Sequence, residues 1–448
     1  MPFDLGIEGG TVVTSAGRRR AHIYVDRERV ASLTDTVQPA RQRFDASGLL
    51  VMPGMVDAHV HFMDPSATER EDFLTGSSAA ACAGVTTVIE HTHAGPVRSA
   101  DDLRQKASYL SDRSHVDYAL AAHAWPGQAE AAMSAWAAGA AYLKAFTCTT
   151  HGISGHDASD LLDLFGQAAE VGATCLVHCE DESLTAAAER RLRQEGRSDP
   201  SVIPQWRSRE AELAAATMTS LLASLTGADV VIAHASNRAV IDSVGRCAPG
   251  AVSIESCPQY LSLYESEVLE HGAFRKFTPP ARARSAADLE DMWRALAEGS
   301  VDYVATDHAP ATYEQKTAAS IWDVHFGLPG IDTTLAVLLD GAAQGQIAYE
   351  TVVKLYSEAP ARIYGLRRKG RLAAGWDADL IVVDPSLSWL VKDQDMLSKA
   401  RWSPLAGRTL TGRAVATFLR GQLVAQDGRI LGDGPGGHFI SGRGASTI

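Results

Sequence analysis

The sequence predicts an α/β fold, a (β/α)8 TIM barrel joined to a small β-sandwich domain that is formed from both termini. Three observations predict it: strand-like apolar runs alternate with helical patterns in the middle of the chain, polar residues end several of these runs, and both ends are rich in short strand-like segments. The length of 448 residues suits a barrel of about 250–350 residues plus a smaller domain.

The two ends of the chain predict the small β domain. FDLGIEGGTVVT near the N-terminus, and GRLAAGWDADLIVVDP and AVATFLRGQLVAQDGRI near the C-terminus, are rich in Val, Ile and Leu and are interrupted by glycines and polar residues. We therefore predict that residues 1–52 and 368–448 form the small domain and that residues 53–367 form the barrel. The glycine-rich tail GDGPGGHFISGRGASTI predicts a loose segment, or one that lies over another subunit.

The middle of the chain contains eight strand-like runs, which are GMVDAHVHF, GVTTVIEHT, VDYALAAHA, AAYLKAF, ATCLVHC, ADVVIAHA, AVSIESC and VDYVATDHA. Continuous apolar runs of this kind are typical of a parallel sheet that is buried on both faces. The stretches between them, such as DASDLLDLFGQAAEVG, are amphipathic, and several begin with the Ser or Asp that often caps a helix.

Polar residues at the C-terminal ends of these runs favour a closed barrel over an open sheet. The residues are His59, His61, Lys144, His178, His234 and Asp307. In an open sheet in chain order, the first and eighth strands would lie roughly 34 Å apart, at about 4.8 Å per strand. Closing the sheet makes these strands neighbours and directs all the C-terminal ends at one mouth. The sequence therefore predicts a shared site at that mouth.

Composition argues against several classes of partner. The formal charge of −13, from 41 basic and 54 acidic residues, repels nucleic acid and anionic membrane surfaces. There is no apolar run of 18 residues, and the N-terminal segment lacks the apolar stretch of a signal peptide. The six cysteines form no CxxC pair. We expect no nucleic-acid partner, no membrane partner and a cytoplasmic location.

The polar strand ends predict a metal site. His59 and His61 are two residues apart on a strand, so their side chains point the same way and can bind one ion. The alternative for this pair is two buried histidines that are satisfied by hydrogen bonds, and His178 or His234 alone could also be a core histidine. Asp307 leaves an apolar run, where an unpaired carboxylate is costly unless a metal or another cation lies beside it.

Lys144 lies on an apolar strand, where lysine is rarely buried without a partner. Two interpretations stay open from the residues alone. In the first, the side chain extends to solvent or pairs with an acid. Alternatively, a neutral amine there has captured CO2 as a carbamate, which turns the cation into a carboxylate that can bridge two metal ions.

Together these motifs resemble those of the cyclic amidohydrolases of the amidohydrolase superfamily, the group of hydantoinase or dihydropyrimidinase, allantoinase and dihydroorotase. The resemblance covers nearly the whole chain, through GMVDAHVHF, YLKAF, LVHCED, IAHAS, ESCPQYL, ATDHAP and FGLPGIDT to SPLAGRTLTGRAVATFLRG. It implies a hydrolase that opens the ring of a small cyclic amide similar to hydantoin, allantoin or dihydropyrimidine. It also implies a homo-oligomer, a dimer or a tetramer.

The resemblance assigns roles to all six polar residues. It implies that His59, His61 and Asp307 hold one ion, that His178 and His234 hold a second, and that the carbamate of Lys144 bridges both. The ions would be zinc, although imidazole and carboxylate ligands also suit manganese or iron. A hydroxide between the ions would attack the substrate carbonyl, and Asp307 would accept its proton and pass it to the leaving ring nitrogen.

The resemblance also marks four candidate substrate contacts. Met63 stands where dihydroorotases have arginine and allantoinases asparagine, Thr149 where hydantoinases have tyrosine, and Phe326 where hydantoinases have asparagine. Thr278 stands where related enzymes place a small polar residue whose backbone meets the ring amide. The SPLAGRTLTG stretch is most similar to allantoinases. Dihydroorotase activity, linear amide cleavage or deamination on the same ions, and a non-catalytic oligomeric scaffold therefore remain alternatives.

Further histidines follow the second, third and fourth strands. The loop 147–157 contains His151 and His156 and predicts either a lid or an exposed loop. We expect the others to line the pocket or to pack in the core, and we favour these roles over metal binding: His91, His93 and His123. Asp57 and His308 are candidates to orient metal ligands through hydrogen bonds.

Overall fold

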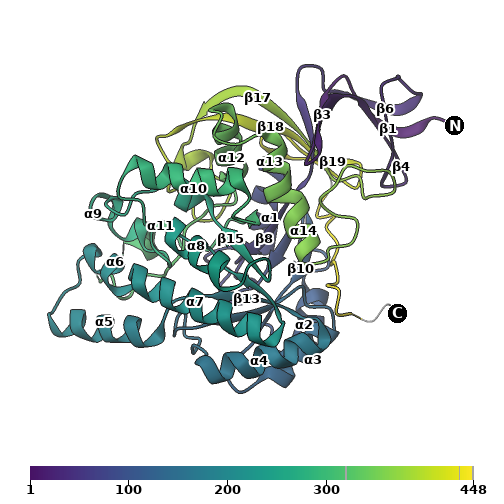
Figure 1. The fold of residues 1–448 in the computed structure, drawn as a ribbon. Helices are drawn as coiled ribbons and strands as arrows, with labels where there is room; N and C mark the ends of the chain where they lie inside the picture. The colour runs from purple at the N-terminus through teal and green to yellow at the C-terminus, as the bar shows by residue number, and fades with distance from the viewer. Residues whose placement is uncertain (318–319, 433, 446–448) are drawn as a thin grey trace.

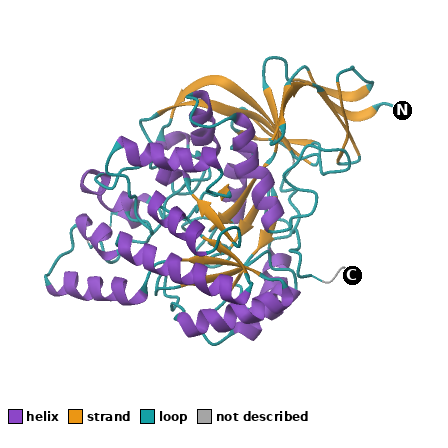
Figure 2. Cartoon of the chain, viewed as in Figure 1, coloured by secondary structure: helices purple, strands orange, loops and turns teal. Residues whose placement is uncertain are grey.

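The barrel strands lie inside a ring of helices, and a second assembly of strands lies at one end of the molecule (Figures 1 and 2). This computed structural model describes all residues except 318–319, 433 and 446–448. The strands of the barrel are β8 (Met55–Val60), β9 (Val85–Glu90), β10 (Asp117–Leu120), β11 (Ala122–His123), β12 (Leu143–Phe146), β13 (Thr174–His178), β14 (Asp229–Ile232), β15 (Val252–Ser256) and β16 (Tyr303–Val304).

Parallel pairing in chain order closes the barrel. The strands pair in the orders β10-β9-β8 and β11-β12-β13-β14-β15-β16. Strands β10 and β11 are two parts of one interrupted strand, because the residue between them, Ala121, still donates its N–H to the carbonyl of Glu90 on β9 at 3.0 Å. After β16 the chain returns to β8, where the N–H of His61 donates to the carbonyl of His308 at 2.8 Å. The (β/α)8 barrel expected from the sequence is confirmed.

The helices surround the barrel and, together with short 3-10 turns and one π turn, connect its strands. They are α1 (Phe73–Cys82), α2 (Ala100–Tyr109), α3 (Ala129–Ala137), α4 (Ala158–Val171), α5 (Glu182–Gln194), α6 (Ile203–Trp206), α7 (Arg209–Thr226), α8 (Arg238–Cys247), α9 (Glu267–His271), α10 (Ala286–Glu298), α11 (Tyr313–Lys316), α12 (Thr334–Ala343), α13 (Tyr349–Val353) and α14 (Ala359–Ile363). Ser99, Asp157 and Ser285 cap α2, α4 and α10, as their positions before amphipathic stretches predict.

Two further sheets form the β-sandwich expected from the termini. One has the order β5-β4-β1-β6 and the other β20-β19-β18-β17-β7-β2-β3. Their strands are β1 (Phe3–Glu8), β2 (Thr11–Thr14), β3 (Gly17–Arg20), β4 (His22–Asp26), β5 (Arg29–Thr34), β6 (Ala40–Asp45), β7 (Leu50–Pro53), β17 (Leu380–Leu390), β18 (Thr409–Leu419), β19 (Gln422–Gln426) and β20 (Arg429–Ile430). Antiparallel pairing of β7 with β17 joins the two ends of the chain, and Ile7, Ile23 and Phe418 pack in one core between the sheets.

Residues 437–442 of the C-terminal tail lie along the barrel, although a loose segment or one over another subunit was the expectation; residues 433 and 446–448 of the tail lie outside the described residues. Tyr118 on β10 donates its N–H to the carbonyl of His438 at 2.9 Å, and Ile440 donates its N–H to Tyr118 at 2.7 Å. The rings of Tyr118 and Phe439 lie 5.8 Å apart. Backbone hydrogen bonds and the contact between Phe439 and Tyr118 therefore fix this part of the tail, although its many glycines predict a mobile segment. The domain boundaries at residues 53 and 367 stay a prediction.

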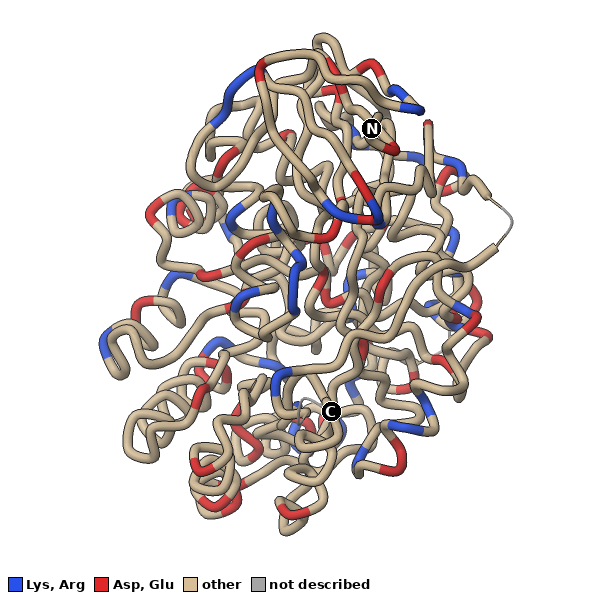
Figure 3. Tube along the Cα trace, turned by 90° about the vertical axis from the view of Figure 1, so that its right-hand side faces the viewer, with Lys and Arg blue, Asp and Glu red and all other residues tan. Residues whose placement is uncertain are grey.

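Charge is mixed over the chain. Basic and acidic positions are interspersed along the trace in Figure 3. Among the described residues, no helix is both long and apolar enough to cross a membrane.

A buried ion cluster joins the barrel to the sandwich at Lys369. Its ammonium contacts Asp117 on β10, Asp379 at 2.7 Å and Asp377 at 3.1 Å. Burial disfavours the charged amine, but the carboxylates of Asp379 and Asp117 raise the pKa of Lys369. Arg420, at the end of β18, also pairs with Asp117. Without the lysine, these three carboxylates would lose the cation that contacts all of them.

Lys369→Met is therefore expected to lower the free energy of unfolding by about 3–5 kcal/mol, because it leaves buried carboxylates without their cation. Thermal or urea unfolding measures the loss. Arg368→Met is the matched control: its guanidinium pairs with Asp377 at 2.8 Å but is 47% exposed, so its loss should cost under about 1 kcal/mol. Equal effects of the two substitutions would contradict the structural role assigned to Lys369.

Candidate metal-binding active site

The six residues predicted as metal ligands line one small cavity at the C-terminal mouth of the barrel. It has a volume of about 20 Å³, room for roughly one water molecule. Strands β8, β12 and β13 supply His59, Lys144 and His178, and the segments that follow β8, β14 and β16 supply His61, His234 and Asp307. These residues are separated by up to 248 positions in the sequence, and barrel closure brings them together.

His59, His61 and Asp307 form the first group of ligand atoms. The Nε2 atoms of both histidines lie 3.2 Å from Oδ1 of Asp307. The Nδ1 atom of His59 lies 2.7 Å from the carboxylate of Glu255, and that of His61 contacts the carbonyl oxygen of His91. Because these partners only accept hydrogen bonds, both Nδ1 atoms hold protons, and in neutral rings the Nε2 lone pairs face a carboxylate. The two lone pairs and the carboxylate oxygen repel one another, and a cation between these three atoms would be coordinated by all of them. The site therefore fits a metal ion.

His178 and His234 form the second group. The Nε2 atom of His178 lies 2.8 Å from Oε2 of Glu180 and donates to it, which leaves a lone pair on Nδ1 in a neutral ring. That Nδ1 atom faces Nε2 of His234 at 3.0 Å. Among the described residues, Nδ1 of His234 has no hydrogen-bond partner. Two ring nitrogens directed at one point suit a second ion.

Lys144 lies between these groups without a partner. It is 1% exposed, and within the described part of the chain its Nζ atom makes no hydrogen bond. The ring of Phe146, 5.3 Å away, is a neighbour of the amine. Burial lowers the pKa of Lys144, against the opposing charges of Glu255 and Asp307. The structure therefore does not support a lysine that reaches solvent or pairs with an acid, and a neutral amine is the form that reacts with CO2.

Glu255 is a buried carboxylate that holds several parts of the site. Besides the ring of His59, it accepts the backbone N–H of His234 at 3.0 Å and the hydroxyl of Tyr303 at 2.7 Å. Burial by itself raises the pKa of Glu255, but the hydrogen bonds from His59 and Tyr303 are among the contacts that hold it below its ordinary value. Glu255 fixes the proton position and the orientation of His59. It is not among the residues predicted from the sequence, although an acid within the apolar run AVSIESC is a usable signal.

Glu180 has the same role for His178 and is also absent from the predicted residues. It accepts hydrogen bonds from His178, from Thr278 at 2.6 Å and from Arg207 at 3.2 Å. Burial by itself raises the pKa of Glu180, but the charge of Arg207 and the bond from His178 lower it to about 2. Its position two residues after His178 in LVHCED is the signal in the sequence.

Asp57 and His308 do not orient ligand rings. Asp57 accepts the backbone N–H groups of Thr306 at 3.1 Å and His59 at 3.3 Å, and the hydroxyl of Tyr356 at 2.9 Å. Burial raises its pKa to about 6. The Nδ1 atom of His308 accepts the backbone N–H of Gly330 at 3.1 Å. Both residues act on the backbone around the mouth of the barrel: Asp57 bonds to the main chain of the predicted ligand His59, whereas His308 bonds to the segment that begins at Gly330.

Two of the four candidate substrate contacts line the cavity. Thr278 and Phe326 belong to its wall, whereas Met63 and Thr149 do not. Met63 is buried with a φ of 58°, and its sulfur accepts a hydrogen bond from Thr92 at 3.4 Å. Thr149 is exposed, and its N–H donates to Glu182. Direct substrate contact is therefore unsupported for these two residues, because local backbone geometry and exposure place them outside the wall.

The loop 147–157 contributes to the wall through His151. The ring of His151 stacks on that of His93 with centroids 4.0 Å apart and planes 7° apart, and both rings line the cavity. His156 is buried, and its Nδ1 atom lies 3.2 Å from the carbonyl of Phe146. One histidine thus faces the site and the other anchors the loop.

Comparisons with known proteins identify the family of this chain. The amidohydrolase family matches residues 50–424. An allantoinase of Rubrobacter xylanophilus is 34% identical over 98% of this chain and 97% of its own, and a dihydroorotase of Halobacterium salinarum is 34% identical over 92% and 94%. The L-hydantoinase (dihydropyrimidinase) structure from Arthrobacter aurescens aligns with a TM-score of 0.93 at 29% identity, covering 98% of this chain and 100% of that one. The chain belongs to the amidohydrolase family.

Proposed function

We propose that this protein is a metal-dependent hydrolase that opens the ring of a cyclic amide similar to hydantoin, allantoin or dihydropyrimidine. The observation that supports it most is the convergence of four imidazoles, one unpaired buried amine and one carboxylate on a single cavity. The relatives named as allantoinase, dihydroorotase and hydantoinase match the chain nearly end to end, which supports the same class of substrate.

The proposed metal centre uses all six residues. His59, His61 and Asp307 would hold one divalent ion, His178 and His234 the other, and a carbamate on Lys144 would join the two. Zinc suits this ligand set, and manganese or iron would also fit it. Bound ions would make a water molecule acidic enough to attack at neutral pH and would polarise the amide carbonyl.

Asp307 has the position for the proton transfers. Its Oδ1 atom faces the cavity between the two histidine rings, and burial raises its pKa. As a carboxylate it would accept the proton of the attacking water and then donate it to the ring nitrogen as the C–N bond breaks. Glu255 and Glu180 would keep His59 and His178 in one tautomer throughout.

The cavity wall argues against dihydroorotase activity. Dihydroorotate has a carboxylate that needs a cationic partner, and among the described residues Lys144 is the only lysine or arginine that lines the cavity. Met63 stands at the position where dihydroorotases have arginine, and it is buried outside the cavity wall. A neutral cyclic amide such as hydantoin or dihydrouracil needs no such partner. The alternative of a non-catalytic scaffold is not supported, because all six predicted metal ligands line the cavity.

The space at the site is small compared with a substrate ring. A cavity of about 20 Å³ holds roughly one water molecule, far less than a five- or six-membered ring. His151 on the loop 147–157 and Phe326 stand in that wall. We propose that this loop is a lid that opens to admit the substrate. The homo-oligomeric state expected from the resemblance stays a prediction.

A panel assay tests the proposed function. Protein purified with zinc or manganese should open at least one ring among hydantoin, dihydrouracil and allantoin, and chelation should remove the activity until metal is restored. Elemental analysis of the same samples should show two or more ions per chain. Full activity after chelation would contradict the metal-dependent mechanism, and turnover of linear amides or aminated rings alone would favour the alternative reactions.

A further inference from the structure

We propose that His91, His93 and His123 form an additional metal site, separate from the six residues of the candidate active site. Nitrogen atoms from the three rings all lie within 4.8 Å of one another. The ring centroids are 5.8 Å apart for His91 and His93, 5.4 Å for His91 and His123, and 5.9 Å for His93 and His123. The residues follow β9 or end β11, so two neighbouring barrel strands place them together.

These rings have unused ligand atoms. Within the described part of the chain, both nitrogens of His91, both nitrogens of His123 and Nδ1 of His93 are buried and lack a hydrogen-bond partner. His91 is 1% exposed and His123 is 2% exposed. Buried polar atoms are nearly always satisfied, and each one left unpaired costs about 1–3 kcal/mol. An ion bound by one lone pair from each ring would remove part of this cost.

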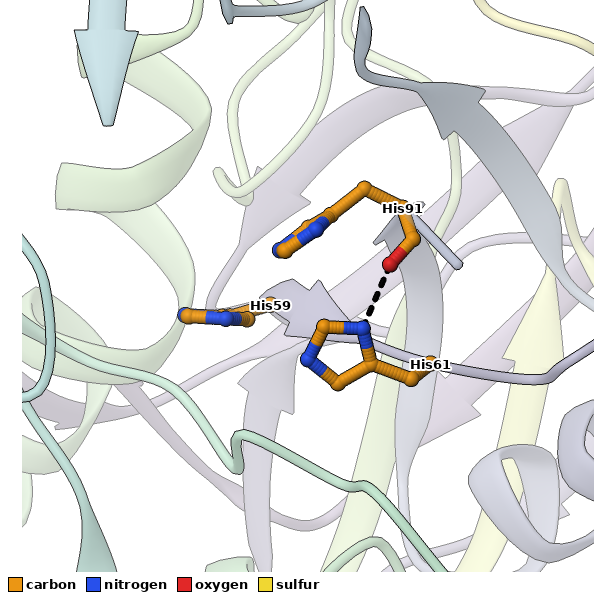
Figure 4. A group of neighbouring side chains, drawn as sticks. All are labelled: His59, His61 and His91. Atoms are coloured by element: carbon orange, nitrogen blue, oxygen red, sulfur yellow. Dashed lines mark hydrogen bonds between the residues drawn. The ribbon is translucent and has the colours of Figure 1, made fainter. Parts of the chain in front are cut away.

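The cluster does not compete with the candidate active site for its ligand atoms. His61 packs between them, with ring centroids 4.3 Å from His91 and 4.2 Å from His93. Both nitrogens of His61 are already directed elsewhere. Its Nε2 atom faces Asp307 at 3.2 Å, and its Nδ1 atom faces the backbone oxygen of His91, as Figure 4 shows. The ring of His91 also packs 4.7 Å from that of His59, but both of its nitrogens lack a hydrogen-bond partner among the described residues and remain available to an ion shared with His93 and His123. A grouping of His91 with His59 and His61 is the competing arrangement.

The chemistry of the ligands selects the class of ion. No carboxylate belongs to this group of three, and the nearby Glu90 is paired with Lys106 at 2.6 Å. Three neutral imidazoles suit Zn²⁺, Cu²⁺ or Ni²⁺ and disfavour Mg²⁺ or Ca²⁺. A tetrahedral zinc ion with Zn–N bonds of about 2.0–2.1 Å holds its nitrogens roughly 3.4 Å apart, so modest ring rotations would close the site. A set of three histidines leaves the fourth position for water or another ligand.

Metal counting tests the proposal. The wild-type protein is loaded with Zn²⁺ and freed of unbound ion, and zinc per chain is measured by elemental analysis. Three ions are expected for the wild type and two for His123→Asn. His115→Asn is the matched control, since His115 is half-buried and belongs to none of the clusters, and it should keep three. Lys144→Ala should retain one ion in the histidine cluster even if the active-site pair is lost, so failure of this site and failure of the proposed function give different counts.

Anomalous scattering at the zinc edge from wild-type crystals supplies the second measurement, which does not depend on how any variant folds. The expected result is a peak among the rings of His91, His93 and His123. Two ions in both the wild type and His123→Asn would overturn the proposal. A fully loaded crystal whose peaks all lie among the active-site ligands would also overturn it. A peak bound by His59, His61 and His91, with none among His91, His93 and His123, would do the same.

Discussion

Replacing Lys144 with alanine is expected to abolish ring opening and to remove the two active-site ions. The amine is buried between the two ligand groups and has no hydrogen-bond partner among the described residues, so its removal breaks no other interaction. Without the carbamate, the ligands would lack the anion that joins the ions and offsets part of their charge. Turnover should fall by at least about 10³-fold, because the activated water and the polarised carbonyl are lost together.

Three measurements check this expectation. Elemental analysis counts the ions, ring-opening assays give turnover, and ¹³C NMR after loading with labelled bicarbonate should show a carbamate signal in the wild type only. Acetate, which fits the space that the shortened side chain leaves, should restore part of the activity of Lys144→Ala. Lys316→Ala is the matched control, because Lys316 is also 1% exposed but donates to backbone carbonyls of Lys276 and His325. Unchanged metal content in Lys144→Ala would remove Lys144 from the metal centre.

The barrel was predictable because its signals are local and periodic. Apolar runs such as ATCLVHC and ADVVIAHA, each ending in a histidine, mark both a strand and its functional end. Closure then follows from the need for His59 and Asp307 to share a site, and the structure places them 3.2 Å apart. The pattern within each strand and the topology of the fold together specify which residues meet.

The supporting carboxylates were not predictable in the same way. Which acid meets which ring depends on how side chains from different strands interdigitate inside the barrel, and neither periodicity nor spacing encodes it. Glu255 on β15 reaches His59 on β8 across 196 positions of sequence. The substrate contacts predicted in loops were harder to place: Met63 is buried against Thr92 and does not line the cavity, and no pattern in the sequence indicates this.

The cluster of His91, His93 and His123 shows a limit of another kind. Each residue follows or ends an apolar strand, as the predicted ligands do, so the sequence offers the same signal for both sets. Only the three-dimensional arrangement separates them, because it shows which ring nitrogens face acceptors and which face one another without partners. The sequence therefore predicts six metal ligands and gives no reason to add these three histidines.

Replacing Asp307 with asparagine should separate proton transfer from metal binding. Asparagine keeps the size of the side chain and one oxygen that can approach an ion, but it cannot accept and return a proton at neutral pH. Turnover is expected to fall by about 10²–10⁴-fold, the range typical of a lost general acid or base, while the fold and most of the bound metal remain. The wild-type kcat/KM should decrease as pH falls, since protonation of Asp307 removes the base, and this acid limb should be absent from the residual activity of Asp307→Asn.

Asp302→Asn provides the control for this substitution. Asp302 precedes β16, at the end of the strand opposite the cavity, and accepts the N–H of Ile254 at 2.8 Å. Its replacement should leave both turnover and the pH profile near those of the wild type. If Asp307→Asn lost its metal in step with its activity, Asp307 would act as a ligand and no separate proton-transfer role would be needed. If the variant kept its turnover, the proton would have to reach the leaving nitrogen from another group, and water entering past His151 would become the leading candidate.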